Sequence, residues 1–361
     1  MMPPPSAFLP DGVAGRIRRV AAAAEKLGRL HPDMLELAHE WQWFRALVPK
    51  RYGGLALPLP AMVRLEEGLS WADGSLGWTV TLCSGAGWFA GFFPPASFPV
   101  MGRQRPGEEK VEPDVLFGDP GLCLAGSGTA SGRAEEVDGG YRVEGRWAYA
   151  SGAVHATAFT ANCVLYKDGV PQVEGAGDPL VRPFLFLPEE VTVHFDWNAV
   201  GLVATGSHGF SVRELFVPAE RVFVIAPEAA ADDDPLYRYP FLPLAEATLA
   251  ANTSGLAQHF LDCCAEWGLG GAELEAGRLE LAERRTVFYR ELQQSWDVDG
   301  RGFPEGVGRA SRELAAAALY WVDRLYPQAG LGAARVDSEI NRVWRDLHTA
   351  SQHPLLRPNQ H

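Results

Sequence analysis

Apolar side chains recur at helical spacing through the first hundred residues. Between residues 12 and 27 they fall three or four positions apart, at Val13, Ile17, Val20, Ala24 and Leu27. This period places them on one face of a helix. Similar patterns predict helices over residues 34–44, 60–69 and 76–92. Residues 94–120, rich in Pro, Gly, Glu and Arg, predict a surface helix and a loop that leave this helical region.

The period changes from helical to alternating between about residues 121 and 225. Short runs alternate apolar and polar positions, and clusters of Gly, Pro, Asp or Asn separate them, which is typical of strands and turns. The predicted strands cover residues 142–149, 158–166, 184–187, 191–197 and 210–217. Strands repeated at this spacing predict a small barrel or sandwich.

Helical patterns return from Leu242 to the C-terminus. The predicted helices cover residues 244–267, 272–296, 310–326 and 333–351, and turns with Gly or Pro separate them. Four helices of this length predict a bundle. The chain is therefore expected to be an α+β protein with an N-terminal helical domain (1–119), a central β-barrel or sandwich domain (120–228) and a C-terminal four-helix bundle (229–361).

Composition narrows the possible functions. The net charge of −13, without clustered Lys and Arg, argues against a nucleic-acid partner. Five cysteines without C-x-x-C spacing favour neither a disulfide framework nor a metal site. The N-terminus lacks a signal peptide, and no apolar run approaches the length of a membrane span. We therefore expect a cytoplasmic protein with no metal and no membrane partner.

Three segments carry candidate chemistry. Residues 141–156, Y-R-V-E-G-R-W-A-Y-A-S-G-A-V-H-A, form a predicted strand that ends at a Ser-Gly corner. Residues 124–132 offer Gly and hydroxyl groups that would let backbone N–H groups approach a ring or phosphate, or would form a plain turn. The C-terminal R-D-L-H-T-A-S-Q-H ends at His353. Ordinary packing also explains single residues here: Trp147 could fill a sheet core, and His353 could cap a helix.

Together these segments resemble the acyl-CoA dehydrogenase-fold flavoproteins. The G-x-W of residues 145–147, the V-P-K-R-Y-G-G of residues 48–54 and the segment 201–218 all match the family's pattern. The S-G-A-V-H-A ending and the R-D-x-x-T-A-x-x-H of residues 345–353 resemble its two-component monooxygenase branch. The resemblance implies a homo-oligomer, tetramer or dimer, that hydroxylates a small aromatic or polycyclic substrate with reduced FAD or FMN. A separate flavin reductase partner is implied, since no strand-linked G-x-G-x-x-G is present.

The resemblance also implies roles for individual residues. Ser151 would position the substrate, and His353 would reach the flavin as a hydrogen-bond donor. The implied cofactor-binding residues are Ser127, Thr129, Trp147, Tyr149 and Arg345. The helix predicted over residues 76–92 would line the substrate pocket with Trp78, Trp88 and Phe92, although such an aromatic stripe also fits core packing.

Some positions depart from the family pattern, and other functions stay open. Val203 replaces the usual arginine, and Ala150 replaces a second hydroxyl. No Glu follows Arg345-Asp346, so acyl-CoA dehydrogenation is not expected, although Glu246 or Glu266 could supply a base. The alternatives are a dehydrogenase-like enzyme, a flavin-free binding or scaffold protein, and a hydrolase that pairs Ser151 with a histidine. The hydrolase lacks a G-x-S-x-G motif.

Overall fold

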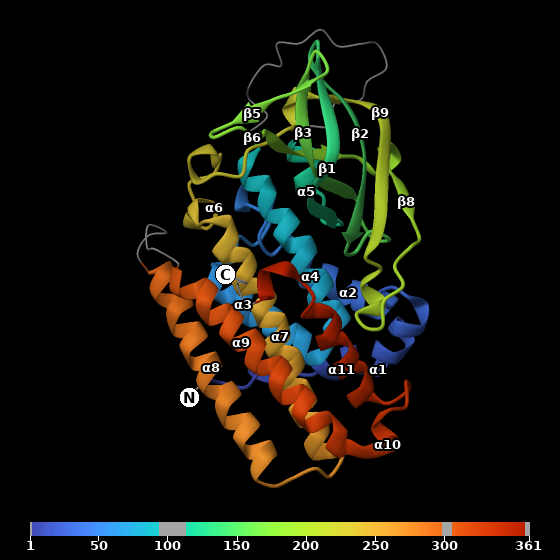
Figure 1. The fold of residues 1–361 in the computed structure, drawn as a ribbon, viewed down its shortest axis with the longest axis vertical. Helices are drawn as coiled ribbons and strands as arrows, with labels where there is room; N and C mark the ends of the chain where they lie inside the picture. Colours follow the sequence, from blue (N-terminus) through green and yellow to red (C-terminus); the bar gives the residue numbers. More distant parts are fainter. Residues whose placement is uncertain (1, 94–112, 298–304, 358–361) are drawn as a thin grey trace.

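The chain folds as an α+β protein with a β-sheet at one end and packed helices over the rest (Figure 1). The structure is a computed structural model that describes residues 2–93, 113–297 and 305–357. Most of the surface helix and loop predicted over residues 94–120 lies outside these ranges. Its described end contains a short helix, α5 (Pro113–Gly118).

The predicted N-terminal helices are present, with shifted ends. They are α1 (Val13–Leu27), α2 (Pro32–Glu40), α3 (Leu59–Ala72) and α4 (Gly74–Trp88). Asp73 begins α4 because its carboxylate accepts the backbone N–H of Leu76 at 2.9 Å. The α-helix ends at Trp88, and a 3-10 turn continues the chain to Phe92, so the predicted helix over residues 76–92 contains two elements.

The central domain is built on one seven-stranded sheet in the order β4-β3-β1-β2-β9-β8, with β7 also paired to β3. Only β1 and β3 run parallel among these neighbours. Residues 124–132, considered as a loop from their composition, instead begin the longest strand. The strands are β1 (Leu124–Val137), β2 (Gly140–Ala150), β3 (Ala158–Lys167), β4 (Val170–Pro171), β7 (Val181–Phe186), β8 (Thr192–His194) and β9 (His208–Pro218), beside the separate pair β5 (Val173–Glu174) and β6 (Asp178–Pro179).

The C-terminal region is helical, as predicted, but its last helix is shorter than expected. A turn at residues 334–338 interrupts the helix predicted over 333–351, where the Ser338 hydroxyl donates to the carbonyls of Ala333 and Arg335. The helices are α6 (Pro235–Arg238), α7 (Phe241–Glu266), α8 (Ala272–Trp296), α9 (Glu305–Leu325), α10 (Gly330–Ala333) and α11 (Glu339–Ala350).

The two helical regions share one hydrophobic core, while the sheet has its own. The backbones of α3 and α7 approach so closely that a Cβ on Gly255 would lie 2.3 Å from the carbonyl oxygen of Glu67. Helices far apart in the sequence therefore form one packed unit, and the sheet lies at one end of it (Figure 1).

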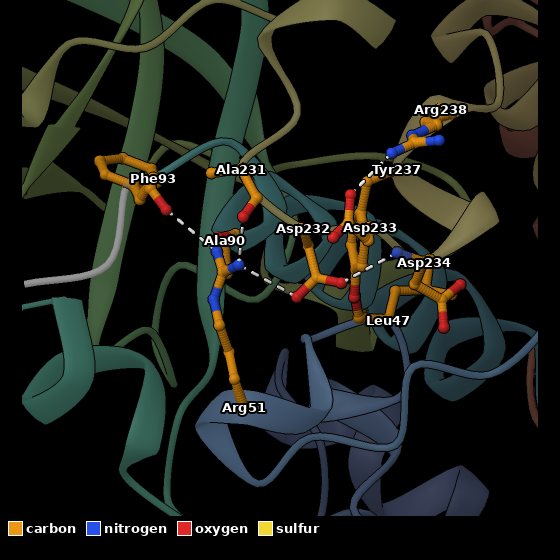
Figure 2. Close-up of polar contacts among 10 residues, drawn as sticks. All are labelled: Leu47, Arg51, Ala90, Phe93, Ala231, Asp232, Asp233, Asp234, Tyr237 and Arg238. Carbon is orange, nitrogen blue, oxygen red and sulfur yellow. Dashed lines mark hydrogen bonds and ion pairs between the residues drawn. The ribbon is translucent and has the colours of Figure 1, made fainter.

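Arg51 ties the turn after α2 to the segment that enters the bundle (Figure 2). Its guanidinium donates to the carbonyls of Ala90, Phe93 and Ala231, the last at 2.6 Å, and pairs with Asp232 at 3.1 Å. One planar group thus joins the end of α4 to the start of the C-terminal helices, which uses the several fixed donors of arginine.

A second arginine neutralises a carboxylate inside the helical core. Glu67 on α3 is fully buried and accepts two hydrogen bonds from Arg285 on α8, at 2.7 and 2.8 Å. Tyr289 and Ser254 donate to the same carboxylate. The charge pair is acceptable in this interior because every oxygen has partners.

We expect Arg285→Leu to destabilise the protein by about 3–5 kcal/mol, because it leaves the Glu67 carboxylate buried without its counter-ion. Arg284→Leu is the matched control, since Arg284 neighbours it on α8 but forms surface pairs, and about 1 kcal/mol or less is expected. Urea unfolding monitored by circular dichroism measures both changes. Equal losses in the two variants would contradict the assignment.

Candidate functional site

Helix α4 brings together two predicted residues that lie about two hundred positions apart in the chain. On one side, a Cβ on Gly152 would lie 2.7 Å from the Cys83 sulfur, and the Cys83 thiol donates to the Ser151 carbonyl at 3.5 Å. On the C-terminal side, the ring centroids of Trp78 and His353 lie 6.0 Å apart. Ser151 and His353 therefore both pack against this helix.

The Ser151 hydroxyl belongs to a chain of buried hydroxyl groups. Its oxygen lies 2.8 Å from that of Ser207, which lies 2.7 Å from that of Thr205. Thr205 donates to the carbonyl of Leu202 at 2.7 Å. Because the recorded partner of Ser151 is Ser207 and not a histidine, this arrangement does not form the pair that a serine hydrolase needs.

His353 is held in one tautomer by its own backbone. It caps the short 3-10 helix Pro354–Leu356, where its Nδ1 accepts the N–H of Leu355 at 3.3 Å. Burial lowers the pKa of His353 to about 4, so the ring is neutral near pH 7 and its proton is on Nε2. Within the described residues this Nε2 has no recorded partner. His353 is thus a neutral donor.

Aromatic side chains remain exposed beside the end of β2. The Tyr149 side chain is 72% exposed, and its backbone has a φ of 63°, which is uncommon for a residue other than glycine. Its ring contacts Trp197 at 6.2 Å between centroids, and the 80% exposed Phe195 packs on His208 at 5.1 Å. We call Tyr149, Phe195 and Trp197 the aromatic surface.

The predicted cofactor residues of β1 and β2 differ in accessibility. Trp147 is fully buried in the sheet core against Phe210, so it lies beneath the aromatic surface and not on it. In β1 the pairing with β3 shifts between Ser127 and Gly132, and the intervening residues are exposed. The hydroxyls of Ser127 and Thr129 have no recorded partner among the described residues, so they are available to a ligand.

Arg345 and Asp346 fix the segment that leads to the hydroxyl chain. Arg345 donates to Glu25 at 2.5 Å and to the Val200 carbonyl at 2.7 Å. Asp346 accepts the N–H of Leu202 at 2.5 Å. These contacts join α11 to residues 200–202, so the guanidinium of Arg345 already has protein partners.

The three predicted pocket residues lie in two places. Trp88 packs on Phe92 with ring centroids 4.6 Å apart, and its indole N–H donates to the Leu236 carbonyl at 3.0 Å. Trp78 lies ten residues earlier on α4, which corresponds to about 15 Å along a helix. The structure therefore brings Trp78, but not Trp88 or Phe92, next to His353.

Two residues of the hydroxyl chain were not predicted as site residues from the sequence. Thr205 and Ser207 belong to the T-G-S of the segment 201–218, which was matched as a family pattern. The sequence shows that the Thr205 and Ser207 hydroxyls stand two positions apart. It does not show that Ser207 pairs with Ser151, which is 56 residues away and meets it only in the folded chain.

Among the described residues, one group outside this region could hold a metal ion. His259, Cys263 and Glu339 offer ligand atoms within 4.8 Å of one another, at the contact of α7 with α11. In the structure, however, Glu339 lies 3.1 Å from His259 and 3.6 Å from Arg342. The carboxylate thus has a cationic partner already.

No family model matches the chain, but individual proteins do. A pigment production hydroxylase from Rhodococcus sp. (strain ATCC 21145) is 34% identical over 343 residues, covering 86% of this chain and 82% of that protein. The oxygenase component of an FADH(2)-dependent resorcinol hydroxylase from Rhizobium sp. (strain MTP-10005) is 26% identical, covering 95% and 88%. The crystal structure of the HsaA monooxygenase from M. tuberculosis superposes with a TM-score of 0.83 at 23% identity, covering 98% of this chain and 93% of that one.

Asp346 gives the stability of this region a pH dependence. Burial and then the charge of Asp73 raise the pKa of Asp346 from 3.8 to about 7, so the folded state holds a proton that the unfolded chain releases between these values. The unmutated protein, the parent of the variants below, should therefore lose stability as pH rises from about 4 to about 7.

We expect Asp346→Asn to lose less stability than the parent over this pH interval, since it cannot release that proton. Its side-chain oxygen can still accept the Leu202 N–H. Urea unfolding at several pH values tests this, with the surface carboxylate variant Asp337→Asn as control. Parallel pH profiles for Asp346→Asn and the parent would be incompatible with a buried Asp346 that holds a proton in the folded state.

Proposed function

Since this chain belongs to the flavin-dependent monooxygenases of the acyl-CoA dehydrogenase fold, we propose that its own residues Ser151 and His353 serve aromatic hydroxylation beside a reduced flavin. The observation that carries this proposal is that both residues pack against α4, Ser151 at Cys83 and His353 at Trp78. The relatives include a resorcinol hydroxylase, which supports a small aromatic substrate.

The residues beside α4 fit a flavin. A planar ring needs apolar surface, which Tyr149, Phe195 and Trp197 offer, and its polar edge needs hydrogen-bonding groups, which Ser127 and Thr129 supply without other partners. When bound, reduced FAD or FMN supplies the electrons that activate molecular oxygen.

The remaining residues have supporting roles in this proposal. Trp147 supports the sheet below the aromatic surface, and Arg345 acts on the cofactor indirectly by fixing Val200. Ser151 orients a polar group of the bound molecules, and the neutral His353 donates a hydrogen bond from Nε2. Trp78 packs against His353 and excludes water from this donor, while Trp88 and Phe92 pack on each other farther along the chain.

We also propose a reductase partner and a cytoplasmic location for this protein. The name of the Rhizobium relative, an oxygenase component that depends on FADH(2), supports a separate reductase that delivers reduced flavin to this chain. No helix within the described ranges is both long and apolar enough to cross a membrane. The five cysteines are buried free thiols, which supports function in the reducing cytoplasm.

A groove on the outer side of the bundle supports a homo-oligomer, dimer or tetramer. It lies between α8 and α9, has a volume of about 390 Å³ and includes Leu279, Val287 and Trp321. Leu279 is 63% exposed, so its apolar side chain is open to cover by a second copy of the chain. We expect Leu279→Glu to lower the oligomer mass in light scattering. A monomeric parent of 39.2 kDa would remove this proposal.

The proposed function is tested with a flavin reductase, NADH, FAD or FMN, and a panel of simple phenols and indoles. The purified chain should convert at least one aromatic compound into a product with one added oxygen atom, detected by mass spectrometry with ¹⁸O₂. Reductase alone is the control. Failure to bind reduced flavin under anaerobic conditions would overturn the proposal, because the activity depends on that complex.

We expect His353→Ala to retain reduced-flavin binding but to lower product formation roughly 10²–10³-fold, as typical for the loss of one preorganised donor. Oxygen consumed by the variant should appear as hydrogen peroxide, which a peroxidase assay quantifies. His348→Ala is the matched control, because His348 lies five residues earlier and pairs with Asp323 on the other side. An unchanged ratio of product to peroxide in His353→Ala would exclude the donor role.

A further inference from the structure

We infer that Thr205 and Ser207 make Ser151 a hydrogen-bond acceptor, so that the site selects ligands presenting an N–H or O–H donor to it. The inference rests on the proposed function, since it concerns how Ser151 meets the flavin or the substrate. Thr205 and Ser207 act through Ser151 and are positioning residues.

The direction of each hydrogen bond follows from the end of the chain. The Leu202 carbonyl can only accept, so the single proton of the Thr205 hydroxyl points to it. Thr205 must then accept from Ser207, because its own proton is already used. By the same argument Ser207 accepts from Ser151. The Ser151 proton therefore points into the protein, and only its lone pairs remain for a ligand.

The surroundings prevent this direction from reversing easily. Thr205 is fully buried and Ser207 is 4% exposed, so water cannot replace a lost partner of these two hydroxyls. The backbone holds the chain in place as well, because the Gly152 N–H donates to the Thr205 carbonyl at 2.8 Å.

The anchor carbonyl is itself fixed. Leu202 has a φ of 50°, a conformation that a leucine adopts only when its surroundings impose it. The Leu202 carbonyl also accepts the indole N–H of Trp197 at 3.0 Å, and the Leu202 N–H is held by Asp346. Leu202 thus sets the direction of the Ser151 hydrogen bond. Because Asp346 holds the Leu202 N–H, α11 contributes to that direction as well.

Two ligands could supply the donor. Reduced flavin carries an N–H in its central ring where oxidised flavin has a bare nitrogen, and a phenolic substrate carries an O–H that its methyl ether lacks. Both offer the same chemistry to Ser151, so separate measurements must identify the source.

The test uses Thr205→Val, which keeps the shape of Thr205 and removes the hydroxyl that sets the direction. The Leu202 carbonyl keeps its bond from Trp197, and Ser207 becomes free to donate to Ser151. Thr205→Ser is the matched control because it retains the hydroxyl. Ser207→Ala is a second variant that interrupts the chain, in case Thr205→Val does not fold by circular dichroism.

The primary measurement is the dissociation constant for oxidised and for anaerobically reduced flavin, by fluorescence titration. We expect the parent and Thr205→Ser to prefer reduced flavin, and Thr205→Val and Ser207→Ala to lose roughly three- to tenfold of that preference, the worth of one hydrogen bond. The second measurement is the affinity ratio of a phenol to its methyl ether. A change there, with an unchanged flavin ratio, identifies the substrate as the donor.

The outcomes separate this inference from the proposed function. If the parent binds flavin but neither ratio changes in the two variants, the inference is wrong and the proposed function stands. If the parent binds neither redox state of flavin, the proposed function fails, and only a changed phenol ratio would preserve the acceptor role of Ser151. If the parent binds no flavin and the phenol ratio is also unchanged in the variants, the inference and the proposed function are both wrong.

Discussion

Burial of α4 on all sides is the constraint on which the rest of the structure depends. Nearly every residue of this helix is buried, so it has no solvent face and must be matched by neighbours in every direction. Small residues make this possible: a Cβ on Gly77 would lie 2.6 Å from the backbone nitrogen of Ser70, and one on Gly74 would lie 2.6 Å from the side chain of Leu256 on α7. The helix thereby contacts the sheet, the N-terminal helices and the bundle at once, and can hold groups from all three.

Burying polar groups around this central helix costs folding free energy unless they form hydrogen bonds. Most of these groups do form hydrogen bonds within the protein. Asn252 on α7 donates to Thr81 at 2.8 Å and accepts from Ser70. Glu67 is neutralised by Arg285. Among the described residues Glu66 is an exception, because both its oxygens are buried without a well-formed hydrogen bond, although Thr81 lies nearby, and burial raises its pKa well above the usual value. A protonated Glu66 is consistent with that environment.

The site has the character of a dry, neutral environment with oriented hydrogen bonds. His353 is uncharged because burial lowers its pKa, and Ser151 is oriented through neighbouring hydroxyls and not through a charged base. The exposed rings of Tyr149 and Phe195 lie at the edge of this region, where they can be covered by a ligand. Asp346 and Arg345 act on the site only indirectly, since they fix residues 200–202 by their backbone. Removing water from fixed dipoles strengthens them, and this suits chemistry on an aromatic ring.

The sequence by itself determined the order of helices, sheet and bundle, because the periods of apolar positions change near the boundaries. It also indicated the family, through short motifs at Trp147, Ser151 and His353, whose residue types reflect local chemistry. It did not reveal that residues 124–132 form a strand, since small residues and hydroxyls also suit a turn and only the pairing with β3 decides between them.

Tertiary structure alone decided which side chains meet. Trp147 faces the core and Tyr149 the solvent, because the positive φ at Tyr149 breaks the strict alternation that a strand pattern assumes. Trp78 meets His353 whereas Trp88 does not, although helical spacing gave both the same prior role. The Ser207 hydroxyl that pairs with Ser151 lies 56 residues away, and the chain of hydroxyls ends at the carbonyl of Leu202, a residue whose N–H is bonded to α11. Such long-range contacts leave no period in the sequence, because they are fixed by packing and not by local backbone preference.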